Sequence, residues 1–152
     1  MNNELAGWDC FWIPIRDGDA RALSLFLRHY TALPYRRTGG RRNRLFVGPG
    51  EKLVLLSPLA DALFVWRKFI DKSGQRGINC AVFRNEGPYL SSAMIIEAER
   101  WAWDRWPGTR LYTYVNAKKV RSVNPGCCFK KAGWRMCGRT KSRGLLILEK
   151  CP

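Results

Sequence analysis

Hydrophobic residues fall into short runs along this chain, and most of the runs are rich in β-branched and aromatic side chains. Such runs, bounded by glycine, proline or polar residues, are typical of β-strands. Gly48-Pro49-Gly50 separates two of them, which predicts a hairpin-like pair at that point. The predicted strands cover residues 10–15, 45–47, 52–57, 62–70, 78–84, 111–116 and 145–148.

Two longer stretches show helical spacing. Asp19 is predicted to cap a helix over residues 20–30, and Ser91 or Ser92 to cap a second helix that extends to about residue 105. In the second helix the apolar positions recur about every 3.6 residues. Its predicted buried face consists of Met94, Ile95, Ala98, Trp101, Ala102 and Trp106.

A short third helix is predicted to begin at Asn124-Pro125 and to close at Ala132-Gly133-Trp134. The order of the elements predicts an α+β domain, with a mixed β-sheet flanked by helices on both faces. A chain of 152 residues suits one domain with a full hydrophobic core, so residues 1–152 are expected to form a single domain.

The composition indicates a globular protein, because apolar residues make up 46% of the chain. No apolar run is long enough to cross a bilayer, and the N-terminus lacks the basic segment of a signal peptide. We therefore expect a soluble, cytoplasmic protein with no membrane partner.

The charge is strongly positive and uneven, with 27 lysines and arginines against 12 aspartates and glutamates. Residues 117–152 carry ten basic side chains and one acidic side chain, and residues 35–44 carry five arginines and no acid. Clusters of this size favour a polyanionic partner, most often nucleic acid. An anionic cofactor or an ordinary solvated surface would also account for them.

The six cysteines include no Cys-x-x-Cys pair, and His29 is the only histidine. Zinc sites usually combine such pairs, so no metal site is predicted. We expect free and mostly buried thiols.

The segment from Arg84 to Ser92 joins a predicted buried strand to a predicted helix through Gly87. The first turn of a helix offers unpaired backbone N–H groups and the positive end of the helix dipole, which suit a pyrophosphate group. Ser91 and Ser92 would add hydroxyl donors, and Arg84 a positive charge. An ordinary capped helix after a turn has the same pattern.

Three segments, in this order, resemble the GNAT superfamily of acyl-CoA-dependent transferases: Arg16-Asp17-Gly18-Asp19, the helix at Ser91, and residues 124–134. The resemblance covers nearly the whole chain and implies a GNAT-like fold with acetyl-CoA as cofactor. The usual Gln/Arg-x-x-Gly-x-Gly/Ala loop of that superfamily is replaced here by Asn85-Glu-Gly-Pro-Tyr-Leu-Ser-Ser92. Acetyl-CoA is therefore implied by the fold rather than by the motif.

A narrower resemblance is to the Mom-type DNA-modification proteins of phages and prophages. Those GNAT-related proteins convert adenine at N6 to a carbamoylmethyl form, which protects phage DNA from restriction. The pair His29-Tyr30 is similar to a His-Tyr pair of that family. The other matching segments are Phe83-Arg-Asn-Glu-Gly87, Leu90-Ser-Ser92, Trp106-Pro-Gly108, Leu111-Tyr-Thr-Tyr-Val-Asn116 and Asn124-Pro-Gly-Cys-Cys-Phe-Lys-Lys-Ala-Gly-Trp134.

The resemblance also implies roles for individual residues. His29 has the only side chain whose unperturbed pKa suits proton transfer near neutral pH. The reacting centre would comprise His29, Tyr30, Asp104 and Tyr114. The cofactor would contact Arg84, Gly87, Ser91, Ser92, Tyr112 and Asn124.

Each of these residues also has an ordinary structural explanation. His29 would serve as a surface or capping residue, Tyr30 and Tyr112 would pack in the core, and Asp104 would pair with Arg100 one helical turn away.

Double-stranded DNA is the implied partner, held through its phosphates by basic side chains while the target base is extruded into a pocket. The first predicted group of contacts is Arg36, Arg37, Arg41, Arg42 and Arg44. The second is Lys118, Lys119, Arg121, Lys130 and Lys131, continued by Arg135, Arg139, Lys141 and Arg143.

Two other functions stay open at this stage. One is a conventional GNAT N-acetyltransferase acting on a protein or a small amine, such as a toxin or an anti-defence protein. The other is a catalytically inert DNA-binding module. The sequence also leaves open the source of the carbamoylmethyl nitrogen, a requirement for a metal or second substrate, and the oligomeric state, a dimer included.

Overall fold

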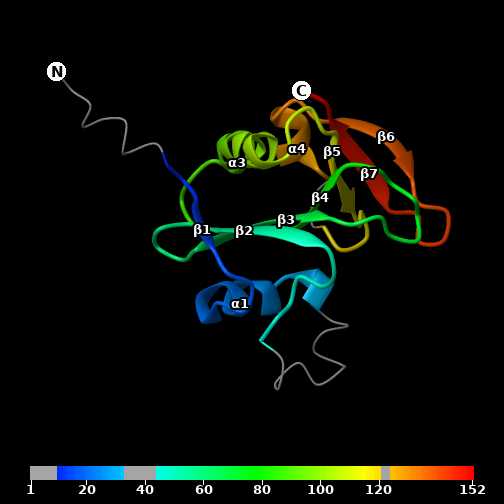
Figure 1. The fold of residues 1–152 in the computed structure, drawn as a ribbon. Coiled ribbons are helices and arrows are strands. Elements are labelled where there is room, and N and C mark those ends of the chain that lie inside the picture. The colour runs from blue at the N-terminus through cyan, green and yellow to red at the C-terminus, as the bar shows by residue number, and fades with distance from the viewer. Residues whose placement is uncertain (1–9, 33–43, 121–123) are drawn as a thin grey trace.

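The computed structural model describes residues 10–32, 44–120 and 124–152 (Figure 1). Its strands are β1 (Ile13–Ile15), β2 (Glu51–Leu56), β3 (Ala62–Lys68), β4 (Ile78–Asn85), β5 (Leu111–Val115), β6 (Arg135–Arg139) and β7 (Leu146–Lys150). Its helices are α1 (Ala20–Leu27), the short 3-10 helix η2 (Tyr30–Ala32), α3 (Ser91–Arg105) and α4 (Cys127–Lys131).

The seven strands form one sheet in the order β1-β2-β3-β4-β5-β7-β6. Within the described ranges, every neighbouring pair is antiparallel except β4 with β5. That parallel pairing begins at Ile78 with Leu111 and ends at Cys80 with Thr113. Beyond it, β4 continues to Asn85 beside β3, and β5 continues beside β7. The sheet therefore divides at the carboxyl ends of β4 and β5.

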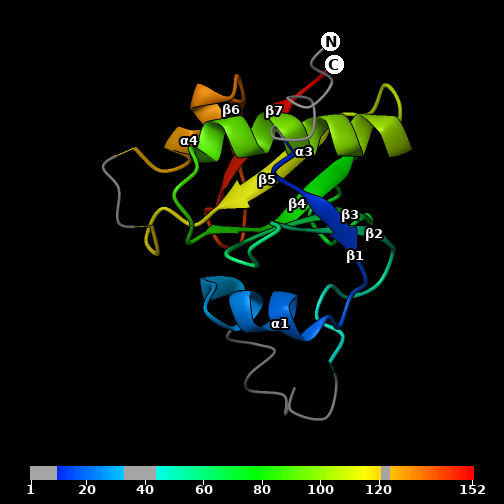
Figure 2. The ribbon, with the colours of Figure 1, turned by 90° about the vertical axis from the view of Figure 1, so that its left-hand side faces the viewer.

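Both faces of the central strands are covered, which explains their nearly continuous hydrophobic sequence. In β2, Val54 and Leu56 pack in the cluster that contains α1, whereas Leu55 packs in the cluster that contains α3. Figures 1 and 2 show α1 on one side of the sheet, with α3 and α4 on the other. The expected α+β domain with a mixed sheet and helices on both faces is confirmed.

Helix α3 is held on the sheet by its apolar face and by two buried indoles. The indole N–H groups of Trp12 and Trp66 donate to the carbonyls of Met94 and Ala98, each at 2.8 Å. Most of the predicted apolar face is confirmed, because Met94, Ile95, Ala98 and Ala102 are fully buried and Trp106 is buried as well. Trp101 is only half-buried.

The same helix carries a buried carboxylate that the sequence did not single out. Glu99 is only 1% exposed, and it forms an ion pair with Lys150 at the end of β7. The Lys150 ammonium also donates to the carbonyl of Ala132 at 2.7 Å, just after α4. Burial raises the pKa of Glu99, and the charge of Lys150 opposes that rise. This pair ties α3, α4 and β7 together.

Lys150→Met is expected to lower the free energy of unfolding by about 3–5 kcal/mol, because it leaves the Glu99 carboxylate buried without its cation. Urea denaturation measures the change. The exposed Lys131→Met serves as the charge-matched control, with an expected change within about 0.5 kcal/mol. The double variant Glu99→Leu with Lys150→Met should recover most of the loss. Equal effects of the two single variants would contradict this account.

The first helix starts as predicted and ends earlier. The Asp19 carboxylate accepts hydrogen bonds from the backbone N–H groups of Arg21 and Ala22, so the predicted cap is confirmed. The N–H groups of Arg28 and His29 bond three residues back, to Leu25 and Phe26, rather than four. This tightening ends α1 at Leu27, and η2 follows as a separate turn.

The predicted strand at 10–15 is shorter in the structure, because its first residues bond to α3 instead of to a neighbouring strand. The backbone N–H of Phe11 donates to the Glu97 carboxylate at 3.1 Å. The predicted hairpin of 45–47 with 52–57 is wrong for a related reason. The N–H groups of Phe46 and Val47 donate to the Asp17 carboxylate, and β2 pairs with β1 and β3.

Two predicted helix starts are also wrong. Leu90 occupies the N-cap position of α3 without a side-chain hydrogen bond, so neither Ser91 nor Ser92 caps it. Helix α4 begins at Cys127 rather than at Asn124-Pro125, and its N-cap is Gly126, whose φ is 77°. A Cβ at Gly126 would lie 2.5 Å from a methyl group of Leu148, so the close approach of α4 to β7 requires glycine there.

Strand β6 was missed because its side chains give no apolar alternation. It lies at the edge of the sheet, with Gly138 half-buried and the remaining residues exposed.

The expectation of mostly buried thiols is wrong as well. All six cysteines are free, Cys10, Cys137 and Cys151 are exposed, and only Cys80 is buried. Within the described ranges, every helix is too short or too polar to cross a lipid bilayer.

Candidate functional site

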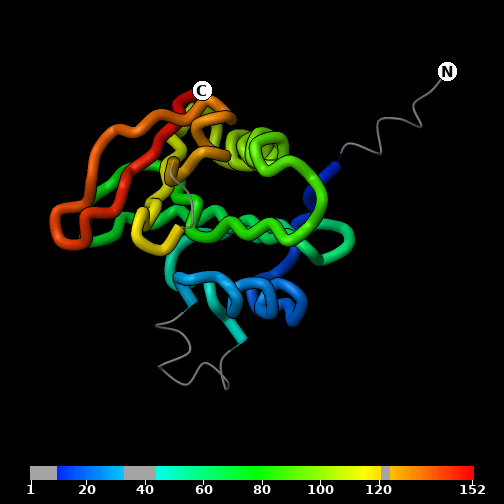
Figure 3. The backbone as a smooth tube through the Cα atoms, turned by 180° about the vertical axis from the view of Figure 1, so that it is seen from behind, coloured from blue at the N-terminus to red at the C-terminus, as the bar shows by residue number. Residues whose placement is uncertain are grey.

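A cavity of about 920 Å³ opens where β4 and β5 separate. Its walls come from the ends of these two strands, the α1–η2 turn, the segment after β5, α4 and the β6–β7 turn. Figure 3 shows that the β6–β7 hairpin (orange to red) projects at the end of the molecule opposite β1. The lining residues are His29, Tyr30, Thr31, Asn79, Cys80, Ala81, Phe83, Thr113, Tyr114, Val115, Asn116, Lys118, Lys119, Val120, Gly126, Cys128, Phe129, Arg143 and Leu145.

The cavity is positively charged at its solvent side. Lys118, Lys119 and Arg143, here called the cavity cations, line it and are exposed. In the described part of the chain, neither an aspartate nor a glutamate lines the cavity. The deeper walls are apolar or neutral, with Phe83 and Phe129 packed edge to face at 6.0 Å. The cavity therefore suits a ligand with an anionic end and a neutral body.

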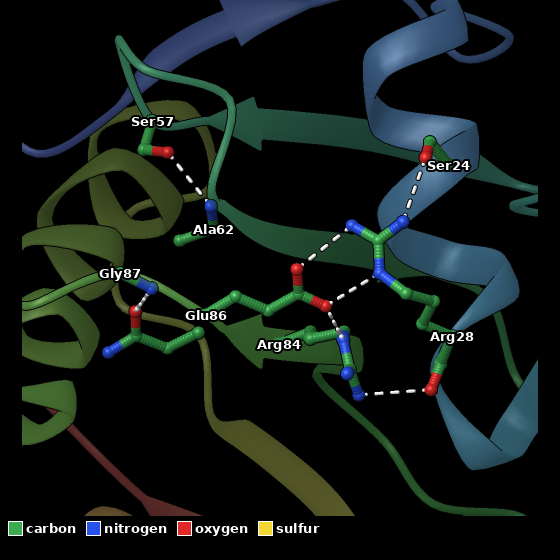
Figure 4. A network of polar contacts seen from close by, with 8 residues as sticks. Ser24, Arg28, Ser57, Ala62, Arg84, Glu86 and Gly87 are labelled. Atoms are coloured by element: carbon green, nitrogen blue, oxygen red, sulfur yellow. Dashed lines mark hydrogen bonds and ion pairs between the residues drawn. The ribbon is translucent and has the colours of Figure 1, made fainter.

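A charged network joins the end of α1 to β4 (Figure 4), next to His29, which lines the cavity. Arg28, at the end of α1, donates to both carboxylate oxygens of Glu86, at 2.7 and 2.9 Å. Arg84 donates to the same carboxylate, and its Nη1 donates to the carbonyl of Arg28 at 2.9 Å. The hydrogen bonds from Arg28 and Arg84 lower the pKa of Glu86 to about 2. The ion pairs and hydrogen bonds of Arg28 thus fix the end of α1, and with it the backbone at His29.

The hydrogen bonds of His29 define which ring nitrogen carries the proton. The backbone N–H of Thr31 donates to His29 Nδ1 at 3.3 Å, and the Thr31 hydroxyl lies 2.8 Å from the same atom. A backbone N–H can only donate, so Nδ1 must accept and the neutral ring carries its proton on Nε2. In this form Nε2 carries an N–H and can only donate a hydrogen bond, which differs from the proton acceptor that a general base requires.

Apart from the cavity cations, the ionisable groups with shifted pKa values favour their neutral forms at neutral pH. Burial, assisted by the positive charge of Arg84, lowers the pKa of His29 from 6.5 to about 4. Burial raises the pKa of Tyr30, against a hydrogen bond to the backbone of Asn116. Burial is also the main reason that the pKa of Tyr114 and that of the Cys80 thiol are raised. At neutral pH the cavity thus combines neutral hydrogen-bonding groups with the cavity cations.

His29 is expected to stay neutral, with its proton on Nε2, from about pH 5 to about pH 8. Because it is the only histidine, long-range ¹H–¹⁵N NMR spectra contain a single imidazole and need no assignment. Arg84→Gln should raise the His29 pKa towards 6.5, because it removes the positive charge beside the ring. A wild-type midpoint near 6.5, or a proton on Nδ1, would contradict the geometry.

The depressed pKa of His29 also predicts how stability depends on pH. Above pH 6.5 the ring is neutral in both the folded and the unfolded chain, so its contribution to the free energy of unfolding is fully present. Between 6.5 and about 4 only the unfolded chain takes up the proton, and stability is lost as the pH falls. Urea midpoints at about pH 7 and about pH 5 should therefore differ less in His29→Asn than in the wild type. The stability that Glu86 contributes through its lowered pKa does not interfere with this comparison, because that stability is lost only below pH 4.5. Equal pH dependence in both proteins would contradict the prediction.

The structure brings together three of the four residues predicted for the reacting centre. His29, Tyr30 and Tyr114 line the cavity, and the rings of His29 and Tyr30 stack at 4.4 Å. The Tyr114 hydroxyl donates to Asp71 at 2.9 Å and contacts Ser73. Asp104 does not line the cavity and lies on the exposed surface of α3.

None of the six residues predicted to contact the cofactor lines the cavity. Arg84 belongs to the network with Glu86, and Tyr112 is fully buried beneath Arg110, whose guanidinium lies 5.1 Å from the ring centroid. Asn124 is exposed and accepts a hydrogen bond from Lys130 at 2.8 Å. The remaining three residues, Gly87, Ser91 and Ser92, lie in the loop before α3 or in its first turn.

The predicted DNA contacts divide into several groups. Lys118 and Lys119 line the cavity, as does Arg143 from the continued set. Lys131 and Arg44 are exposed but do not line the cavity. The Lys130 ammonium donates a hydrogen bond to the side chain of Asn124. Arg36, Arg37, Arg41, Arg42 and Arg121 lie outside the described residues.

Several cavity residues had no functional signal in the sequence. Thr113 and Cys80 sit at the last parallel pair, where the Thr113 hydroxyl donates to the Cys80 carbonyl at 2.9 Å. Asn116 follows β5 and bonds the backbone of the loop that carries Lys118 and Lys119. Only the position of Asn116 at a predicted strand end could have suggested a role.

No protein-family model, curated protein or solved structure matches this chain. The fold itself defines the class of protein: an α+β domain with a mostly antiparallel seven-stranded sheet. Within the described ranges it has one parallel strand pair, and a ligand-sized cavity lies there.

Proposed function

We propose that this protein is a transferase that modifies adenine at N6 in double-stranded DNA with an acyl-CoA-like donor, and so protects phage DNA from host restriction. The GNAT-like fold expected from the sequence is part of this proposal. The observation that carries it is the cavity at the divided end of β4 and β5, with the stacked pair of His29 and Tyr30 on one wall and the cavity cations at its solvent side.

The division of the sheet supports an extended donor. Within the described part of the chain, the edge of β4 that faces β5 has no strand partner beyond Cys80. Backbone groups on such an edge can pair with an extended ligand as they would with another strand. A donor with a long amide-containing arm would fit between the strands, with its anionic end towards the cavity cations.

The aromatic walls support a flat acceptor. His29, Tyr30, Phe83 and Tyr114 all line the cavity, and bases extruded from DNA commonly stack on such rings. Exposed basic residues such as Arg44 and Lys131 would hold the duplex through its phosphates.

In this proposal, His29 acts as a hydrogen-bond donor. Its Nε2–H would stabilise the negative charge that develops on the donor's carbonyl oxygen, a role that suits a neutral ring. Simple acyl transfer joins N6 to the acyl carbon and releases the donor's thiol. That step gives an N-acyl product, with the proton of N6 leaving on the thiol. In a carbamoylmethyl product N6 is joined to a methylene carbon and the carbonyl carries an NH2 group, so that product requires a different bond to N6 as well as a nitrogen-containing co-reactant.

The test is to co-express the protein with a plasmid, digest the plasmid DNA to nucleosides, and measure adenine by mass spectrometry. A modified adenine is expected, and its mass distinguishes an acetyl from a carbamoylmethyl group. His29→Phe should reduce the yield by about 100-fold, as for loss of a single oxyanion donor. Tyr89→Phe, which changes an exposed residue that does not line the cavity, is the matched control.

Three outcomes would decide between functions. An unchanged adenine pool with the wild-type protein would overturn the proposal. Acetyl-CoA binding with unchanged DNA would indicate a conventional N-acetyltransferase. Salt-sensitive DNA binding alone would indicate a DNA-binding module without catalysis.

A further inference from the structure

The loop before α3 is poorly suited to the phosphate group that its sequence suggested. The N–H of Gly87 already donates to the side chain of Asn85 at 3.0 Å, and Pro88 has no N–H to offer. The Asn85 amide also donates to the carbonyl of Tyr89 and to the hydroxyl of Ser91. The N–H of Gly87 and the side chain of Asn85 are therefore already paired within the loop.

A carboxylate also lies directly against this loop. A Cβ built on Gly87 would lie 2.5 Å from Asp61 Oδ2, so the Asp61 side chain fills the space beside Gly87. Asp61 is held there by the Ser57 hydroxyl at 2.7 Å, and its carbonyl accepts from the N–H of Glu86 at 2.8 Å. The negative charge of a carboxylate fixed beside Gly87 would repel a phosphate bound at this loop.

The cavity cations offer the opposite environment. Lys118 and Lys119 stand on a turn closed by Asn116, whose side chain accepts from the N–H of Lys118 and whose carbonyl accepts from the N–H of Lys119. The turn therefore holds both lysines at the carboxyl end of β5, beside the point where the sheet divides.

Arg143 reaches the same cavity from the β6–β7 turn. That turn is closed by Thr140, whose carbonyl accepts from the N–H of Gly144 at 3.0 Å and whose hydroxyl accepts from the N–H of Leu145 at 2.9 Å. Among the described residues, no carboxylate forms an ion pair with Lys118, Lys119 or Arg143. Their charges are available to a ligand.

We propose that Lys118, Lys119 and Arg143 bind the phosphate groups of the small-molecule donor that occupies the cavity, and that the start of α3 does not. The donor class rests on the proposed function. Three cations from two separate turns, around a cavity large enough for a cofactor-sized ligand, match a pyrophosphate at the solvent side with a neutral arm inside.

The test measures the binding of coenzyme A and of ADP by calorimetry, without DNA. The triple variant Lys118→Ala, Lys119→Ala, Arg143→Ala is expected to lower the affinity for both by at least about 100-fold, because it removes several charge-assisted hydrogen bonds. The control Lys131→Ala, Arg139→Ala, Lys141→Ala removes the same charge from exposed positions that do not line the cavity, and should change affinity by only a few fold.

Two further measurements locate the ligand. Coenzyme A should shift the single imidazole resonance of His29 in the wild type and in the control. Ser91→Glu should leave the affinity unchanged, although it would weaken binding if the phosphates lay at the start of α3.

Several results would overturn the proposal. These are the absence of coenzyme A and ADP binding by the wild type, equal losses in the two triple variants, or a loss confined to Ser91→Glu. If the cavity triple variant binds coenzyme A normally but binds duplex DNA less tightly, the three cations serve the DNA backbone instead. Because these measurements use the donor alone, a failure of adenine modification leaves their result unaffected.

Discussion

The short parallel register between β4 and β5 is the constraint on which the rest of the site depends. A parallel pair needs a crossover, and α3 supplies it across one face of the sheet. Because the pairing ends at Cys80 and Thr113, the two strands then follow different neighbours, and the gap between them becomes the cavity. The buried indoles on α3 and the pair of Glu99 with Lys150 hold that helix, and with it the crossover, in place.

The site combines strong positive charge at its edge with neutral groups inside. The network around Glu86 explains why His29 is one of the neutral groups. It places Arg84 close enough to disfavour an imidazolium, and it anchors the end of α1 so that Thr31 can occupy Nδ1. The neutral ring then has a hydrogen-bond donor at Nε2, and this state suits binding and polarisation of a ligand better than proton abstraction.

Sequence patterns were most reliable where one face of an element is buried. The periodic face of α3 and the cap at Asp19 were predicted because both depend on residues close in sequence. The hairpin at 45–47 failed because Asp17, distant in sequence, takes the backbone N–H groups that a ladder would need. The surroundings of the loop before α3 were not predictable for the same reason, because Asp61 from a different turn lies against Gly87.

The sequence by itself determined the α+β class, the number of domains expected and the excess of positive charge, since these follow from local periodicity and composition. It also pointed to His29, Tyr30 and Tyr114, which the fold brings to one cavity. Only the tertiary structure decided which nitrogen of His29 carries the proton, which cations border the cavity, and that Glu99 is buried. Those properties depend on partners such as Thr31, Arg84 and Lys150 and on where the sheet divides, and long-range packing determines such contacts and distances.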